Sequence, residues 1–172
     1  ANEWDPSVLS DGRLIYPRWD YINRHDTIYQ SLWTMRPDGT GTAHFYGNYT
    51  RNPYMIAEAR LIPGSDKIIA TAMAHHSYTA GSIIHIDQKL GEDGPEPLTR
   101  ITPEERFPEG EGRTDHPFTS PWPLNEELTL VARSEEPIVF EGGIQSVNAY
   151  RIWLIDTMGG REEIYVDPNM SC

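Results

Sequence analysis

The sequence predicts an all-β fold made of repeated four-stranded antiparallel sheets, and three observations lead to that prediction. Hydrophobic residues make up 38% of the chain beside 14 Gly and 14 Pro, a balance typical of short strands and turns rather than long helices. Nine Tyr and five Trp fit sheets, where aromatic rings pack across strands. Short apolar runs and turns also recur in one order along 172 residues, which is enough for one domain with a sizeable core.

The first unit contains the clearest turn signals. Residues 10–12 (Ser-Asp-Gly) form a turn, because Asp and Gly tolerate the dihedral angles it needs. We expect the strand that follows to end at Pro17, which cannot donate a hydrogen bond to a central ladder. Residues 37–41 form a tight hairpin, and the entry segment 1–9 directs Trp4 and Val8 inward. The strands expected here are Leu14–Tyr16, Ser31–Met35 and Ala43–Tyr46.

The second and third units repeat that order. Local propensity permits a helical turn over Met55–Ile62, but the repeat makes its end a strand. Residues 102–115 have no periodicity and indicate a surface connection, whose acidic side chains we expect to be solvated. The expected strands are Ala59–Ile62, Lys67–Ala72, Gly81–Asp87, Leu98–Ile101, Phe118–Trp122, Leu128–Ala132, Tyr150–Asp156 and Glu163–Val166.

Alignment of the units indicates a β-propeller. Leu14, Ile68 and Leu128 occupy equivalent positions, and the order of strand, turn, strand, loop, strand, Gly turn, strand is constant. Four antiparallel strands per repeat are typical of propeller blades, which bury their faces by stacking on neighbours. We therefore predict one propeller segment over residues 1–172, with about three blades at roughly 1–52, 53–113 and 114–172.

Charge and cysteine content exclude several functions. The net charge of −12, from 26 acidic and 14 basic residues, argues against a nucleic-acid partner, because a phosphate backbone needs a basic surface. No apolar run approaches the length of a membrane span, and no signal peptide is visible. Cys172 alone supports neither an internal disulfide nor a Cys-based zinc or haem motif. The chain ends abruptly at Cys172, just after residues 167–171, and this favours the interpretation that it is a piece of a longer protein.

The repeats resemble those of TolB-like (PD40-type) β-propellers, through Ser-Asp-Gly-Arg at residues 10–13 and Met-Arg-Pro-Asp-Gly-Thr at residues 35–40. More narrowly, residues 16–21, 45–48, 59–64, 74–78 and 80–84 resemble the middle domain of the hydrazine synthase alpha subunit and its haemless relatives. The resemblance implies a partial six-bladed propeller from a larger periplasmic or secreted protein. The Cys-x-x-Cys-His haem motif of the true synthase is absent from this sequence.

Two groups of residues are candidates for function. His75 and His76 are adjacent, and with His116 they offer imidazole ligands for a transition metal or a contact to haem, with His85 or Asp115 as further ligands. The same histidines also fit a role as loop residues that hydrogen-bond neighbouring backbone.

The loop after the first strand contains Arg18, Trp19, Tyr21 and Arg24, residue types enriched at binding hot spots. A structural alternative pairs its two arginines with Asp20 or Asp26.

Two hypotheses about function follow. In the first, the segment is a non-catalytic binding or scaffold module that contacts other domains or subunits and to which no cofactor is assigned. Three blades would leave two open sheet faces, so we expect an isolated segment to form a homodimer or to aggregate. In the alternative, it is a fragment of a metal- or haem-dependent oxidoreductase with histidines at the blade tops.

Overall fold

The computed structural model describes residues 2–23, 28–76, 79–135, 137 and 150–167. The all-β prediction is confirmed, because the described residues form strands and one short 3₁₀ helix, with no α-helix among them. The elements are β1 (Asn2–Glu3), β2 (Ser7–Val8), β3 (Leu14–Trp19), β4 (Ser31–Met35), β5 (Ala43–Tyr46), β6 (Met55–Leu61), β7 (Ile68–Met73), β8 (Ser82–Ile86), η1 (Gln88–Leu90), β9 (Leu98–Arg100), β10 (Phe118–Pro123), β11 (Leu128–Ser134), β12 (Tyr150–Asp156) and β13 (Arg161–Tyr165).

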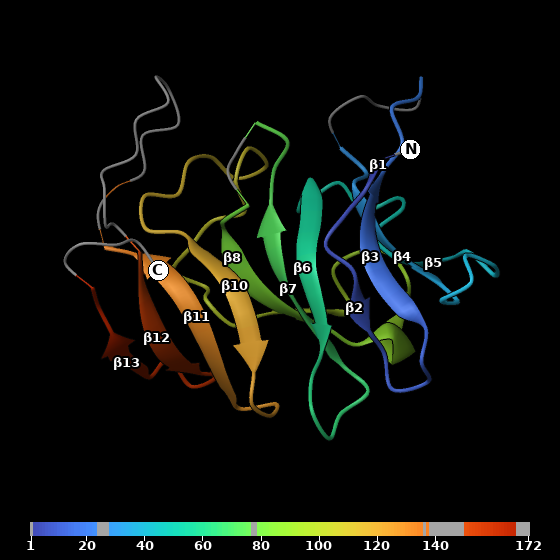
Figure 1. Cartoon of the computed structure of the whole chain (residues 1–172). Helices are drawn as coiled ribbons and strands as arrows, with labels where there is room; N and C mark the ends of the chain where they lie inside the picture. Colours follow the sequence, from blue (N-terminus) through green and yellow to red (C-terminus); the bar gives the residue numbers. More distant parts are fainter. Residues whose placement is uncertain (1, 24–27, 77–78, 136, 138–149, 168–172) are drawn as a thin grey trace.

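The strands form three antiparallel sheets in chain order (Figure 1). The first sheet runs β1-β3-β4-β5, with β2 also pairing with β3. The middle sheet runs β6-β7-β8-β9, and the third runs β10-β11-β12-β13. The middle and third sheets are thus meanders of sequence neighbours, which is the arrangement that short turns between antiparallel strands allow, while in the first sheet β1 and β2 both pair with β3. No described helix has the length and apolar character needed to cross a membrane.

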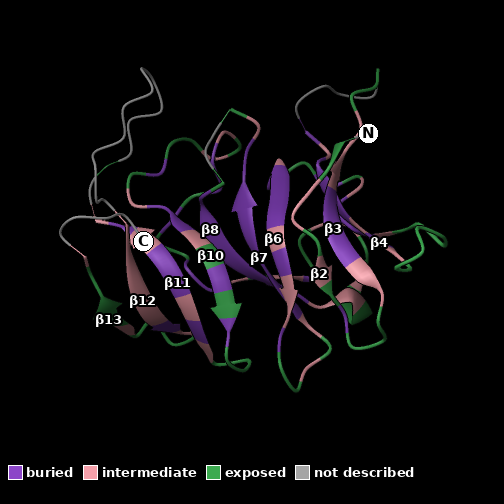
Figure 2. Cartoon of the chain, viewed as in Figure 1, coloured by how far each residue is buried: buried purple, intermediate pink, exposed green. Residues whose placement is uncertain are grey.

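The middle sheet is the centre of the core because both of its faces are covered (Figure 2). Successive side chains of a strand point to opposite faces. Accordingly, Ile84 of β8 packs with the first sheet, and Ile83 packs with the third sheet. Every residue of β7 and β8 is buried. The third sheet instead buries one face against Ile83 and leaves residues of its other face half-exposed.

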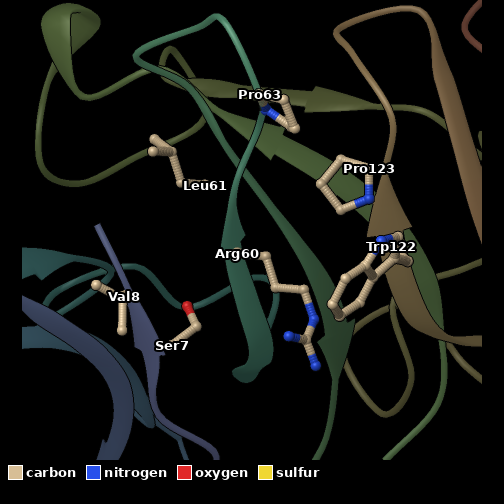
Figure 3. A pocket seen from close by; sticks show the side chains of 7 residues that line it. All are labelled: Ser7, Val8, Arg60, Leu61, Pro63, Trp122 and Pro123. Atoms are coloured by element: carbon tan, nitrogen blue, oxygen red, sulfur yellow. The ribbon is translucent and has the colours of Figure 1, made fainter. Parts of the chain in front are cut away.

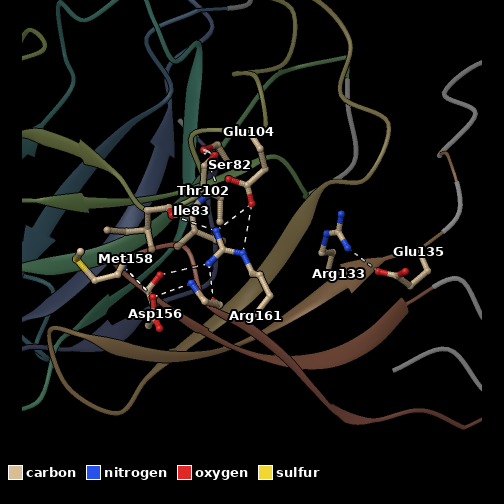
Figure 4. A network of polar contacts seen from close by, with 11 residues as sticks. Ser82, Ile83, Thr102, Glu104, Arg133, Glu135, Asp156, Met158 and Arg161 are labelled. Atoms are coloured by element: carbon tan, nitrogen blue, oxygen red, sulfur yellow. Dashed lines mark hydrogen bonds and ion pairs between the residues drawn. The ribbon is translucent and has the colours of Figure 1, made fainter.

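A polar junction joins the middle and third sheets beside this core (Figure 4). The Thr102 hydroxyl accepts the backbone N–H of Ile83 at 2.8 Å, and the Ser82 hydroxyl lies 3.0 Å from it. Arg161 of β13 donates to Glu104 at 2.9 Å and to the Ile101 carbonyl at 3.4 Å. The first residues of the connection 102–115 therefore attach the outer strand of the third sheet to the end of the middle sheet.

The first strand of each sheet, which lies at one edge, has an irregularity at an equivalent position. In β6 the register shifts by one residue between Ala57 and Arg60, and in β10 it shifts between Thr119 and Trp122. The first sheet has its break between β1 and β2. Asp5, Glu58 and Ser120 lie in these breaks with φ of 45°, 55° and 54°. A one-residue bulge bends a strand and turns the side chains that follow it. The three breaks therefore change the direction of the following side chains in the same way in all three sheets.

Several local expectations were wrong. The first strand continues past Pro17 to Trp19, because neighbouring strands pair with β3 on both sides without needing a proline N–H at that position. β6 begins at Met55 rather than Ala59, because Met55–Ala57 pair with the end of β7. Val8 is 63% exposed instead of packed inward, whereas Trp4 packs against Met55 and Met73.

Candidate functional site

The structure brings together two groups that the sequence suggested separately. Trp19, at the end of β3, and His75, just after β7, have ring centroids 4.6 Å apart. Tyr21 meets Trp19 edge-on at 5.5 Å, and His76 meets His75 edge-on at 4.8 Å. The four rings form a continuous surface, the aromatic–histidine cluster, at the edge of the sheets where β3 and β7 end. This edge is uppermost in Figure 1.

Gln30 fixes the position of His75 from beneath. Its side chain is 3% exposed, and its backbone bridges the first and middle sheets through a hydrogen bond from Ile56 N–H at 3.1 Å. The Gln30 side-chain amide lies 3.1 Å from His75 Nδ1. Because the amide nitrogen only donates, His75 Nδ1 is the acceptor in this contact. A buried residue therefore holds the His75 ring in one orientation.

Glu109 holds both histidines from the connection between the middle and third sheets. Its two oxygens accept the backbone N–H groups of His75 and His76 at 3.1 and 3.2 Å, and Oε1 lies 2.6 Å from His76 Nδ1. Glu109 has a left-handed φ of 60°, which is uncommon for a residue with a side chain. Three segments far apart in the sequence therefore converge on one turn. Nothing in the local sequence singled out Gln30 or Glu109.

The outer part of the cluster is exposed and apolar. Tyr21 is 69% exposed, the neighbouring Ile22 is 51% exposed, and His75 is half-buried. Large aromatic groups on a rigid support can bury much apolar area at a small cost in side-chain entropy. The arrangement is therefore suited to contact with another surface.

The other predicted residues of the loop have different outcomes. Arg18 forms an ion pair with Asp20 at 3.2 Å, and its guanidinium carbon lies 4.7 Å from the Trp33 ring. The pairing that the structural alternative expected for Arg18 is thus observed, and its predicted role in binding stays a prediction. Arg24 lies outside the described residues, so its predicted role in binding stays a prediction.

The histidines predicted as metal ligands do not all converge. The described contact of His116 is between its Nδ1 and the Ser134 carbonyl of β11, at 3.3 Å. His85 is buried on the face of β8 directed at the third sheet, and burial lowers its pKa to about 4, so its ring is neutral at pH 7. In the part of the chain that the structure describes, no group of three or more His, Cys, Asp or Glu is placed to hold a metal ion.

The acidic side chains of the connection 102–115 are not simply solvated, contrary to expectation. Glu105 is 8% exposed, accepts a hydrogen bond from Thr114, and has its pKa raised to about 7 by burial. Glu111 has its pKa lowered to about 2, mainly by its hydrogen bonds from Arg100 and despite partial burial. The connection packs against the sheets, because Phe107 is 2% exposed within the core. Its carboxylates are therefore structural groups.

Comparison with known proteins gives no match to a family model, to a curated protein or to a solved structure.

Proposed function

We propose that this chain is a segment of a β-propeller and acts as a non-catalytic binding and scaffold module. The observation that carries the proposal is the unequal covering of the three sheets. The middle sheet is packed on both faces, whereas each outer sheet packs one face on it and has no described sheet against the other. Propeller blades need a neighbour on each face, so the outer sheets have the character of blades at the two ends of an arc.

The two open faces differ in composition, which gives the module two distinct contact surfaces. On the third sheet, the paired residues Leu130 and Leu154 are half-exposed on the face away from the middle sheet. On the first sheet, Trp33 is half-buried on the face away from the middle sheet with Arg18 over its ring, while Tyr16, which pairs with it, is buried. We propose that these faces contact further blades or subunits of a larger protein. The aromatic–histidine cluster then contacts a separate partner.

The resemblance to hydrazine synthase alpha-like propellers supports the same assignment. In this proposal the parent protein is periplasmic or secreted, and the segment supplies structure and contacts rather than chemistry. The hydrogen-bonding of His75 by Gln30 and Glu109 accounts for the two adjacent histidines without a metal.

Self-association of the purified chain tests the proposal. Half of a ring should dimerise through its open faces, so sedimentation velocity should show concentration-dependent association between about 1 and 100 µM. Leu154→Glu places a charge on the open face of the third sheet and should shift the chain to monomer. Leu90→Glu is the control, because Leu90 is 63% exposed in η1 and lies on neither open face. A monodisperse wild-type monomer over this range would overturn the proposal.

A further inference from the structure

A groove opens along β2, β6 and β10, directly after the three breaks in pairing. It is lined by Ser7 and Val8 from β2, by Arg60 and Leu61 from β6 with the following Pro63, and by Trp122 and Pro123 from β10 (Figure 3). Its volume is about 230 Å³. Ser7, Arg60 and Trp122 each stand two residues after the left-handed residue of their own strand. The structural repeat therefore places one equivalent side chain from each sheet in this inner groove.

Glu58 holds the two main walls of the inner groove together. One of its carboxylate oxygens accepts the Ser120 backbone N–H at 2.7 Å, and the same oxygen accepts the Thr71 hydroxyl at 2.6 Å. These bonds join β6 to β10 and to β7, so the strands on either side of the groove have a fixed separation. A site whose walls are fixed loses little entropy when it binds a ligand.

Arg60 brings to the inner groove a positive charge that no described carboxylate pairs with. Its guanidinium carbon lies 4.9 Å from the centre of the Trp122 ring, and its buried Nε has no hydrogen-bond partner among the described residues. Arg100 and Arg161, by contrast, are each paired with a carboxylate. Arg36, Arg51 and Arg106 also have no described carboxylate partner, but they are exposed to solvent, whereas Arg60 is half-buried. A guanidinium binds a carboxylate with two parallel hydrogen bonds, so Arg60 is suited to an anion from outside the chain.

The rest of the inner groove is apolar and open to solvent. Trp122 is 56% exposed and Val8 is 63% exposed, although both are large hydrophobic side chains. Pro63 and Pro123 add apolar surface and have no backbone N–H to offer. A ligand would therefore find one charged group that fixes its orientation, with an aromatic face and apolar walls around it.

We propose that the inner groove binds a carboxylate attached to an aromatic or branched apolar group. In this arrangement, the carboxylate pairs with Arg60 while the apolar group packs on Trp122 and Val8. The volume of the groove suits one residue-sized acid. Two sources share this chemistry, a free organic acid and the C-terminal residue of a peptide. The site is independent of the aromatic–histidine cluster and of the open sheet faces, so its test does not depend on the proposed function.

Titration of the whole chain with three probes tests the site: phenylacetate, the peptide Gly-Ser-Gly-Phe with a free C-terminus, and the same peptide amidated. We expect saturable binding of at least one free acid, observed as a shift of the Trp122 indole N–H resonance, and no binding of the amide. A tighter complex with the peptide identifies a peptide terminus as the source. Equal or tighter binding of phenylacetate identifies a free acid.

Variants connect the binding to the groove. Arg60→Met keeps much of the side-chain stem and removes the charge, so Kd should rise by about tenfold or more. Arg60→Lys keeps the charge but loses the paired donors, so its Kd should lie between that of wild type and that of Arg60→Met. Trp122→Leu should weaken binding while leaving Arg60 in place. Arg36→Met is the matched control, since it removes the same charge from an exposed arginine outside the groove.

All variants are first checked for wild-type melting temperature. Because Trp122 is more than half exposed, its replacement is expected to leave the fold intact. The site is rejected if neither free acid binds saturably, or if Arg60→Met binds as tightly as wild type. It is also rejected if Arg36→Met weakens binding as much as Arg60→Met, because the effect would then be one of overall charge.

Discussion

β8 of the middle sheet and β12 of the third sheet are both rich in apolar residues, yet their environments differ. All five residues of β8 are buried, whereas Ile155 is the single buried residue of the seven in β12. The difference comes from what lies on each face, since β8 has a sheet on both sides and β12 has the middle sheet on one. The apolar sequence of a strand makes its burial favourable, but the sheets packed beside the strand decide whether it is buried.

The same substitution in the two strands gives the largest expected contrast. Ile84→Ala removes a fully buried side chain between the middle and first sheets, and we expect a loss of about 3 to 4 kcal/mol in the free energy of unfolding. Ile152→Ala removes a half-exposed side chain from the outer face of β12, and the loss should be about 1 kcal/mol. Urea denaturation at low protein concentration measures both.

Repeating both measurements at several protein concentrations distinguishes the two strands further. If the outer face of the third sheet associates with another copy, the cost of Ile152→Ala grows as the protein concentration rises, because the association stabilises the folded state. The cost of Ile84→Ala does not depend on association in this way. Equal costs for the two substitutions at the lowest concentration would contradict the unequal covering of the sheets.

The next contrast is between two carboxylates of the connection 102–115. Burial raises the pKa of Glu105, which lies near Arg133 of the third sheet, to about 7, so the folded state holds a proton that the unfolded chain releases near its ordinary value of 4.5. The resulting stabilisation is present below pH 4.5 and is lost as pH rises through 7. Relative to Glu105→Gln, the wild type should lose about 2 to 3 kcal/mol of unfolding free energy between pH 4.5 and 8.

Glu111 should show the opposite dependence. Hydrogen bonds from Arg100 of the middle sheet lower its pKa to about 2, so its contribution is present above pH 4.5 and is lost as pH falls toward 2. Glu111→Gln should therefore be less stable than wild type at pH 7, and the difference should disappear in acid. Unfolding free energies at several pH values compare both variants with wild type, and parallel curves for the three proteins would refute both assignments.

The smallest expected effect concerns the ion pair that attaches the outer strand of the third sheet. Arg161 donates to Glu104 at 2.9 Å, and the Glu104 side chain is 45% exposed, so water and salt screen the pair. Glu104→Gln should cost less than about 1 kcal/mol, and added salt should reduce even that difference. Thermal unfolding at low and high salt checks it. A loss comparable with that of Ile84→Ala would mean that the junction, rather than the core, holds the third sheet.

Much of the sheet architecture was predictable from local sequence. Turn residues such as those at positions 37–41, together with short apolar runs, fixed the order of strands within each sheet. The helical propensity around Met55 gave way to pairing with β7, as the repeat had indicated. The range of β3 was not predictable from Pro17, because tolerance of a proline depends on which strand lies beside it.

The candidate site was predictable only in part. Trp19, Tyr21, His75 and His76 were recognisable by residue type, but nothing local indicated that the two pairs meet. Gln30 and Glu109 reach His75 across sequence separations of 45 and 34 residues, and such contacts exist only after the sheets have packed. The inner groove was missed for the same reason, since Arg60 and Trp122 are brought together by bulges in two different strands.

The sequence by itself determined which segments become strands, which residues turn the chain and that a unit of about four strands recurs three times, although the first sheet has five strands in the structure. These features depend on dihedral preferences and side-chain alternation, which act over a few residues. The tertiary structure alone decided that β8 is covered on both faces and β12 on one. It also decided that Glu105 is buried while Glu111 meets Arg100, and that Arg60 is left beside Trp122 without a described carboxylate partner. Burial and charge pairing depend on which distant segments become neighbours, and packing of whole sheets sets those neighbours.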